Sequence, residues 1–120
     1  GDVIFSTNKQ RYNGEFSTKV LVVKNICHQA IFYPRKILLE NIFNVKYQMM
    51  GDYELNLRLW NQVKYNYISN DIAIYSNTGL STMLYDKEFK KNFLNIIFKN
   101  LGFKFVFYKI ITTLKGRIFK

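Results

Sequence analysis

One carboxylate in this sequence follows a glycine at the start of a helix-prone segment, and it is the strongest candidate for acid–base chemistry. Asp52 comes after Gly51 and precedes residues 53–62, which are rich in Leu, Glu and Arg. At the tip of a helix, a carboxylate can project into a cleft and accept a proton there. It can equally accept hydrogen bonds from the free N–H groups of the first turn, as a cap worth about 1 kcal/mol. Both interpretations of Asp52 remain open from the residues alone.

A second candidate is the polar pair His28 and Gln29, which interrupts the mostly apolar residues 26–33. Polar side chains within an apolar run need hydrogen-bond partners or a polar pocket to line. The pair therefore predicts either the wall of a pocket or a histidine with a structural partner.

Metal and thiol chemistry have little support in the sequence. The runs 52–54 and 86–88 have the form acid-x-acid, but each falls in a helical segment, where positions i and i+2 point to different sides. There is no Cys/His cluster with the spacing of a zinc site. Cys27 is the single cysteine, which excludes an internal disulfide, fits a reducing compartment and predicts a small buried hydrophobe.

Short strands and helices must position these candidates. The alternation of apolar and polar residues, together with β-branched and aromatic runs, predicts strands at residues 3–5, 63–69 and 72–75. Pro34 can begin a short helix that ends near Glu40, and a second helix covers residues 53–62. We expect an irregular connection at residues 43–50 and a turn at residues 77–79.

The last third of the sequence has the pattern of two basic amphipathic helices separated by Gly102. Apolar residues recur at helical spacing on both sides of this glycine. The first stripe is Tyr85, Phe89, Phe93, Ile96 and Ile97, and the second is Phe103, Phe107, Ile110, Leu114 and Ile118. From Asp86 onward there are nine basic residues and two acidic ones, so this segment carries seven of the ten net positive charges.

Composition limits the class of protein. A chain of 120 residues is the size of one domain, and its 48% hydrophobic and 18% aromatic residues exclude a disordered or low-complexity segment. Its formal charge of +10 attracts phosphates, nucleic acid or anionic lipid without choosing among them. No apolar run approaches the roughly 18 residues that span a bilayer. Gly1, without an initiator Met before it, indicates a cut edge.

The order of these features resembles that of bacterial family-2 glycosyltransferases. Residues 26–33 (ICHQAIFY), 43–47 (FNVKY) and 51–59 (GDYELNLRL) follow one another at the intervals of the family's His-Gln segment, Phe-Asp-x-x-Tyr turn and Asp-Tyr-Asp/Glu-Leu-x-Leu-Arg helix. Residues 67–68, 72–75 and 79–81 resemble its closing strand and Gly-Leu-Ser segment. Asn44 stands where an Asp is usual. The resemblance covers about residues 3–81.

The resemblance implies an α/β fold, namely part of a Rossmann-like GT-A domain with short mixed strands. It divides the chain into an acceptor-side part at residues 1–81 and a basic helical tail at residues 82–120. Asp52 then occupies the position of the general base, which deprotonates an acceptor hydroxyl as it displaces the nucleotide from an activated sugar with inversion. His28 and Gln29 become pocket residues, and Glu54 and Arg58 become further candidate substrate contacts. A structural ion pair is an equally good interpretation of Arg58.

The resemblance also implies parts that this sequence lacks. The nucleotide-binding strands and the Asp-x-Asp motif, which holds Mg²⁺ or Mn²⁺ in the parent enzyme, would lie upstream, so we expect this chain alone to bind no metal and to be inactive. The expected partners are a nucleotide-sugar donor and a glycan or lipid-linked acceptor in cell-surface polysaccharide synthesis. The expected location is cytoplasmic, peripheral at the inner face of the plasma membrane, with the basic helices lying on anionic lipid.

Two interpretations from other classes remain open. A charge of +10 with many aromatic residues also suits a small nucleic-acid-binding module, although the sequence contains no recognised nucleic-acid motif, so we expect no nucleic acid as partner. Alternatively, the chain is an interaction protein that exposes aromatic surface and dimerises. If the donor half is missing, we expect a homo-oligomer that covers the orphaned sheet edge.

Overall fold

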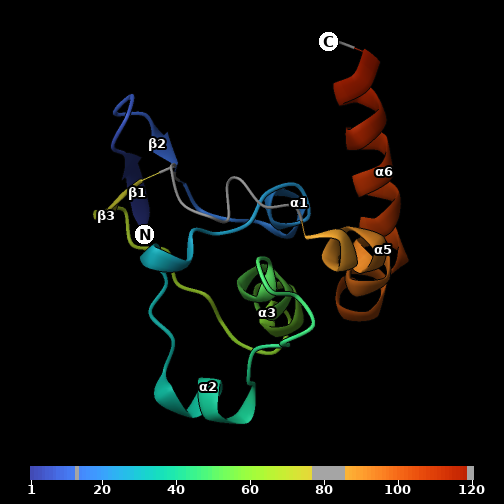
Figure 1. Ribbon diagram of the computed structural model, residues 1–120, viewed down its shortest axis with the longest axis horizontal. Coiled ribbons are helices and arrows are strands. Elements are labelled where there is room, and N and C mark those ends of the chain that lie inside the picture. Colours follow the sequence, from blue (N-terminus) through green and yellow to red (C-terminus); the bar gives the residue numbers. More distant parts are fainter. Residues whose placement is uncertain (13, 77–85, 119–120) are drawn as a thin grey trace.

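The chain folds into a mixed α/β arrangement with a small sheet at one side and a pair of long helices at the other. In this computed structural model, residues 1–12, 14–76 and 86–118 are described. Shorter helices lie between the sheet and the long pair, α5 and α6 (Figure 1). The α/β class expected from the sequence is thus present, on a sheet of three strands among the described residues.

The sheet joins segments from the two ends of the first 76 residues. Strand β1 (Asp2–Phe5) lies in the middle, with β2 (Arg11–Tyr12) antiparallel on one side and β3 (Asp71–Tyr75) parallel on the other. Val3 is fully buried. The expected strands at residues 3–5 and 72–75 are confirmed, and their pairing brings the beginning of the chain beside residues 71–75.

Three short helical segments follow the hairpin of β1 and β2. Helix α1 (Thr18–Leu21) begins after Ser17, whose hydroxyl accepts a hydrogen bond from the first turn. A single 3₁₀ turn, η1 (His28–Ala30), comes next. Helix α2 (Arg35–Glu40) begins directly after Pro34, as expected from the sequence, because proline has no N–H to lose at a helix start.

Helix α3 (Gly51–Leu59) carries the principal candidate residue. It begins two residues earlier than the expected 53–62 and ends three residues earlier. Met50 stands at the cap position without a capping side chain, so Asp52 is the second residue of the helix. After Leu59 the chain turns, with the backbone N–H of Gln62 donating to the Leu59 carbonyl at 2.8 Å.

The strand expected at residues 63–69 is absent, and this expectation was wrong. These residues are described and have no regular secondary structure. Their tyrosines are held by side-chain contacts instead: Tyr65 packs against Trp60 with ring centroids 4.9 Å apart, and the Tyr67 hydroxyl donates to the Asp2 carboxylate at 2.8 Å. Alternating tyrosines imitate a strand pattern, but a strand also needs a neighbour to pair with, and the sheet order β2-β1-β3 gives this segment none.

Two long helices complete the described chain. Helix α5 (Lys87–Leu101) begins after Asp86, whose carboxylate accepts a hydrogen bond from the first turn, and α6 (Phe103–Ile118) follows after one residue. That residue, Gly102, has φ of +90°, a conformation that glycine adopts readily. The expected pair of helices and their boundary are confirmed. Within the described residues, no helix is both long and apolar enough to cross a membrane.

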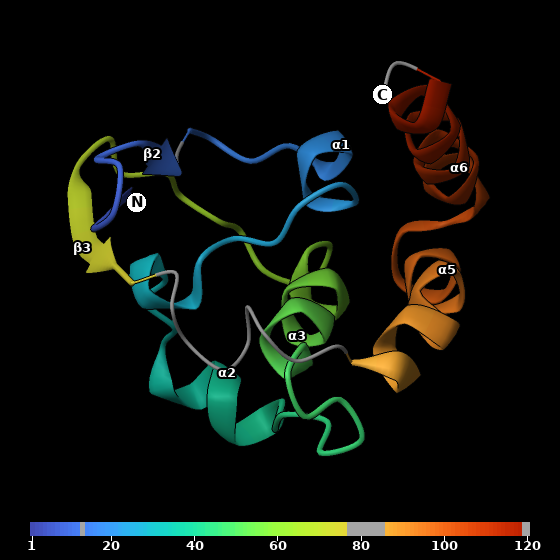
Figure 2. The ribbon, with the colours of Figure 1, turned by 45° about the horizontal axis from the view of Figure 1, so that its top comes forward.

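The main core lies between α1, α3 and α5, and Figure 2 shows α5 between α3 and α6. Its buried members are Leu21, Val22, Tyr47, Tyr53, Leu57, Phe89, Ile96, Ile97 and Leu101. Helix α5 therefore shares a core with elements of residues 1–59. The expected domain boundary after residue 81, the turn at residues 77–79 and the Tyr85 position of the first stripe lie outside the described residues.

Candidate functional site

The Asp52 carboxylate is fixed by a hydrogen bond to each of its oxygens. Its Oδ1 accepts from the backbone N–H of Tyr53 at 2.8 Å, and its Oδ2 accepts from the side-chain amide of Asn25 at 2.9 Å. The side chain is 24% exposed. Asp52 thus satisfies one free N–H of the first turn of α3 and also remains partly accessible.

A chain of polar side chains continues from Asn25 into the interior. Asn25 Oδ1 accepts from the amide of Asn56 at 2.9 Å, and Asn56 is fully buried in α3. Asn56 Oδ1 accepts in turn from the hydroxyls of Tyr33 at 2.5 Å and of Tyr65 at 3.5 Å. In each hydrogen bond of this series the donor lies on the side away from Asp52. The series therefore ends on Asp52 as an acceptor, which matches an ionised carboxylate because its two oxygens can only accept.

His28 brings an imidazole to the same carboxylate from η1. Its Nδ1 lies 3.6 Å from Asp52 Oδ2, and its side chain is 57% exposed. The next residue, Gln29, is exposed and does not line the cavity described below, while Ala30 is buried. The structure therefore brings His28 and Asp52 together and leaves Gln29 outside their contact.

Asp52 and His28 line one cavity of about 730 Å³. Strands β1 and β3 contribute Phe5 and Tyr75, β2 contributes Tyr12, and residues 25–28, 43–45 and 47–52 complete the walls. Most of the lining side chains are apolar or aromatic, and the titratable Asp52 and His28 lie among them. A few polar groups in a largely apolar concavity are the usual composition of a small-molecule site.

The environment of Asp52 raises the pKa of its carboxyl above the ordinary value. Burial is the main cause, and it is opposed by the hydrogen bond from the Tyr53 N–H, the charge of His28 when protonated, and the hydrogen bond from Asn25. A carboxylate with a raised pKa takes up a proton more readily than a solvated one. The site is therefore suited to accept a proton from a hydroxyl group bound in the cavity.

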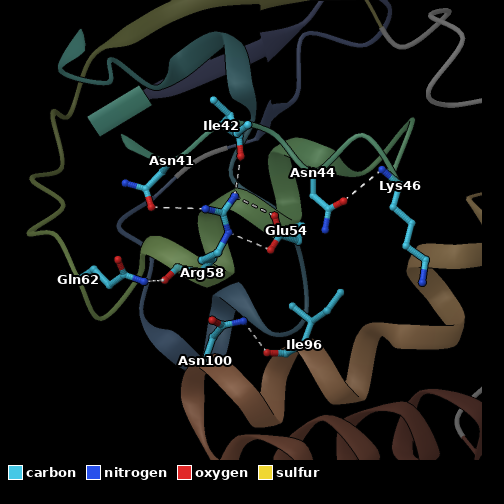
Figure 3. A network of polar contacts seen from close by, with 9 residues as sticks. All are labelled: Asn41, Ile42, Asn44, Lys46, Glu54, Arg58, Gln62, Ile96 and Asn100. Carbon is cyan, nitrogen blue, oxygen red and sulfur yellow. Dashed lines mark hydrogen bonds and ion pairs between the residues drawn. The ribbon is translucent and has the colours of Figure 1, made fainter. Parts of the chain in front are cut away.

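Glu54 and Arg58 lie elsewhere and bind each other. The Arg58 guanidinium contacts both oxygens of Glu54, at 3.0 and 3.1 Å, and also donates to Asn41 and to the backbone carbonyl of Ile42 (Figure 3). Glu54 is buried, and neither residue lines the cavity of Asp52. Their geometry is that of the structural ion pair considered for Arg58.

Several residues of the site carry no signal in the sequence. Asn25 follows an apolar run without any motif of its own, and Tyr12 lies in a polar stretch. The Tyr12 hydroxyl donates to the backbone carbonyl of Asn25, and burial raises the pKa of Tyr12 to about 12. The ring of Phe5 contacts those of Tyr12 and Tyr75 edge-on, with centroids 5.9 and 5.8 Å apart. These contacts depend on the strand pairing, which spacing alone does not reveal.

The described part of the chain contains no cluster of side chains suited to bind a metal ion. Within residues 1–12, 14–76 and 86–118, no three His, Cys, Asp or Glu side chains are grouped so that they could hold an ion. The run 86–88 is used otherwise: Asp86 accepts from the backbone N–H groups of Met49 and Met50, and Glu88 pairs with Lys46 at 3.3 Å. The described residues thus offer no cluster of ligands for a divalent cation.

The amino-acid sequence of this chain is similar to those of proteins named glycosyltransferases. Over 97 residues the chain is 37% identical to proteins called PGL/p-HBAD biosynthesis glycosyltransferase in Mycobacterium bovis and in Mycobacterium tuberculosis. The aligned region is 76% of this chain and 38% of each relative, so the chain spans well under half of their length. No protein-family model matches the chain, and no solved structure matches it significantly.

Proposed function

We propose that this chain is the acceptor-side part of an inverting family-2 glycosyltransferase with a GT-A fold, and that Asp52 is its general base. The similarity to mycobacterial proteins named glycosyltransferases supports the reaction class. One structural observation carries the assignment of Asp52: a partly buried carboxylate with a raised pKa lies on the wall of the 730 Å³ cavity. A general base needs this combination of enclosure and access.

The proposed step is a single displacement. The oxygen of an acceptor hydroxyl forms a bond to the anomeric carbon of the donor sugar, while the bond between that carbon and the nucleotide oxygen breaks. The hydroxyl proton passes to Asp52 Oδ2 or Oδ1, and the nucleotide leaves with the bonding electron pair. Attack from the face opposite the leaving group inverts the anomeric carbon.

The other candidate residues have different parts in this proposal. The His28 ring, 3.6 Å from Asp52 Oδ2, orients the carboxylate and contacts the substrate that enters the cavity. Gln29 is exposed next to it and is proposed to contact the acceptor outside the cavity. Glu54 is proposed to fix the Arg58 guanidinium through the ion pair within α3. Arg58 then holds α3 to the segment after α2 through its hydrogen bonds to Asn41 and Ile42, with no direct contact to substrate.

The remaining expectations concern the parent protein. We propose that the nucleotide-sugar donor and a Mg²⁺ or Mn²⁺ ion are bound by a part of the parent that this chain does not include. The acceptor is a glycan or a lipid-linked sugar in cell-surface polysaccharide synthesis. The parent acts in the cytoplasm, and the chain alone forms a homo-oligomer and lacks transfer activity; light scattering that gives a monomer would contradict the oligomer.

The experiment is substitution of Asp52 in the parent enzyme, with transfer and donor binding measured separately. Asp52→Asn keeps the shape of the side chain and removes its basicity, so kcat should fall by a factor of about 10² to 10⁴, the usual contribution of a general base. The Kd for the nucleotide-sugar should stay unchanged.

Asp71→Asn is the matched control. Asp71 is a half-exposed carboxylate in β3 that pairs with Arg11 at 2.7 Å and does not line the cavity. This variant should transfer sugar at the rate of the unmodified enzyme. If Asp52→Asn does so too, Asp52 is not the base and the proposed mechanism fails.

A further inference from the structure

Helix α6 has an apolar face on each of two sides, and one of them points away from the protein. Phe105, Val106 and Tyr108 pack against the main core. A second row of apolar residues occupies another side of the helix and remains exposed. Its members are Phe103 (70% exposed), Phe107 (58%), Ile110 (40%) and Leu114 (51%), which we call the outer stripe.

The spacing of the outer stripe makes it continuous. Its members are separated by four, three and four residues, so at 100° per residue they fall within a narrow sector of the helix and run along most of its length. Figures 1 and 2 show α6 beside α5 at the edge of the molecule. A single exposed apolar residue needs no explanation, but four in one row indicate a surface that binds something.

The charges around the outer stripe are all positive. Helix α6 contains no acidic residue, and Lys104 and Lys115 are exposed on one flank of the stripe. The two acidic residues at the start of α5 are engaged within the protein: Asp86 caps α5 and binds backbone N–H groups, and Glu88 pairs with Lys46. The partner of this surface must therefore tolerate, or favour, a positive field next to an apolar strip.

The geometry points to an anionic lipid surface: we propose that α6 lies on the membrane, with the outer stripe among the acyl chains and Lys104 and Lys115 at the headgroups. Amphipathic helices with aromatic and aliphatic residues on one side and lysines beside them bind in this way. A second copy of the same helix is disfavoured, because the contact would bring basic residues against basic residues with no acid on α6 to offset them. This surface goes beyond the proposed function and does not depend on it.

Vesicle sedimentation of the 120-residue chain tests the proposal. The chain should bind vesicles that contain phosphatidylglycerol and bind pure phosphatidylcholine vesicles more weakly. The double variant Phe107→Ser/Leu114→Ser should lower the partition coefficient about tenfold or more. Its matched control is Leu39→Ser/Ile42→Ser, which removes two side chains of 68% and 77% exposure from a different region and should bind like the unmodified chain.

A charge series tests the electrostatic part. Lys104→Gln and Lys115→Gln should each weaken binding to phosphatidylglycerol vesicles by about fivefold, since one lysine near such a surface contributes about 1 kcal/mol. Lys9→Gln and Lys36→Gln, which remove the same charge far from α6 in sequence, should have a smaller effect. Circular dichroism of each variant must show unchanged helix content for the comparison to count.

Three outcomes would overturn the proposal. In the first, the unmodified chain fails to bind either kind of vesicle. In the second, Phe107→Ser/Leu114→Ser binds vesicles as well as its control variant. In the third, this variant loses self-association in light scattering while its vesicle binding is unaffected, which would assign the stripe to a second copy of the chain. Because no sugar transfer is measured, each of these results leaves the proposed function of Asp52 untouched.

Discussion

The side-chain amide of Asn25 donates a 2.9 Å hydrogen bond to Asp52 Oδ2 and accepts one of the same length from Asn56. Asn25 thereby links a partly accessible carboxylate to a fully buried amide. Because Asn56 also accepts from two tyrosine hydroxyls, the orientation of each amide in the series is fixed by its neighbours. The position of Asp52 is therefore set by residues that lie behind the cavity wall.

Asn25→Ala should raise the pKa of Asp52 further, because the Asn25 hydrogen bond favours the ionised carboxylate. It should also lower the free energy of unfolding by about 1–3 kcal/mol, since the buried amide of Asn56 loses its acceptor. Titration of the Asp52 side-chain carboxyl by NMR and chemical denaturation measure the two effects. The control is Asn61→Ala, which removes an exposed hydrogen bond from a side-chain amide to the Asn100 carbonyl. This variant should leave the pKa of Asp52 unchanged.

The pH dependence of stability should reveal the raised pKa of Asp52. A carboxyl whose pKa is higher in the folded than in the unfolded state binds a proton more tightly when folded. Its stabilising contribution is complete below the ordinary value of 3.8 and is lost as the pH rises through the folded pKa. The stability of the unmodified chain relative to Asp52→Asn should therefore decline as the pH rises above 3.8 and through the folded pKa.

Urea denaturation at a series of pH values measures this difference, with Asp71→Asn as the reference. Asp71 has an ion pair at the surface and does not line the cavity. A stability difference for Asp52→Asn that rises with pH over the same range would show that the folded pKa is lowered instead, and would contradict the proposed basicity.

Arg58→Met should destabilise the fold by about 3–5 kcal/mol, because it leaves the buried carboxylate of Glu54 without its partner. The double variant Glu54→Gln/Arg58→Met should recover most of this loss. A double-mutant cycle measured by thermal or chemical denaturation gives the coupling between the two residues. If Arg58→Met instead keeps full stability but weakens acceptor binding in the parent enzyme, Arg58 is a substrate contact after all.

The two glycines of the last helices should respond to alanine in opposite directions. Gly102→Ala forces a side chain onto a residue with φ of +90° and should cost about 1–3 kcal/mol, although open space surrounds the site. Gly116→Ala lies within α6, where an added methyl group meets no other atom, and should stabilise the chain by up to about 1 kcal/mol. Thermal denaturation of both variants by circular dichroism compares them directly; equal effects would argue against the helix boundary at Gly102.

Elements with a strong periodic pattern could be predicted from the sequence. The long amphipathic stripes on both sides of Gly102 correspond to α5 and α6, and the short β-branched runs correspond to β1 and β3. Residues 63–69 show the limit of this approach. Their alternation matches a strand, but the Tyr65 ring packs against Trp60 and the Tyr67 hydroxyl donates a hydrogen bond to the Asp2 carboxylate. These contacts belong to the tertiary structure, which a local sequence pattern does not reveal.

The candidate site could be predicted only at its centre. Asp52 stood out because it follows a glycine at the start of a helix, and His28 because it interrupts an apolar run; the structure brings both to one cavity, and their roles stay predictions. Asn25, Tyr12 and Tyr75 could not be found in this way. Asn25 reaches Asp52 from the segment between α1 and η1, and Tyr12 and Tyr75 join the same cavity because β2 and β3 pair with β1. No local spacing encodes such a meeting of distant segments.

The parallel pairing of β1 with β3 has a consequence for how quickly the chain can fold. It joins Asp2 to Asp71, so nearly the whole intervening segment must be closed into a loop before the strands meet. The contact of α5 with α6 needs only the turn at Gly102, because the two helices are adjacent in sequence. Contacts between distant residues form slowly, so during refolding the helical pair should acquire structure first, and the cavity, with walls on both strands, should be complete only at the end.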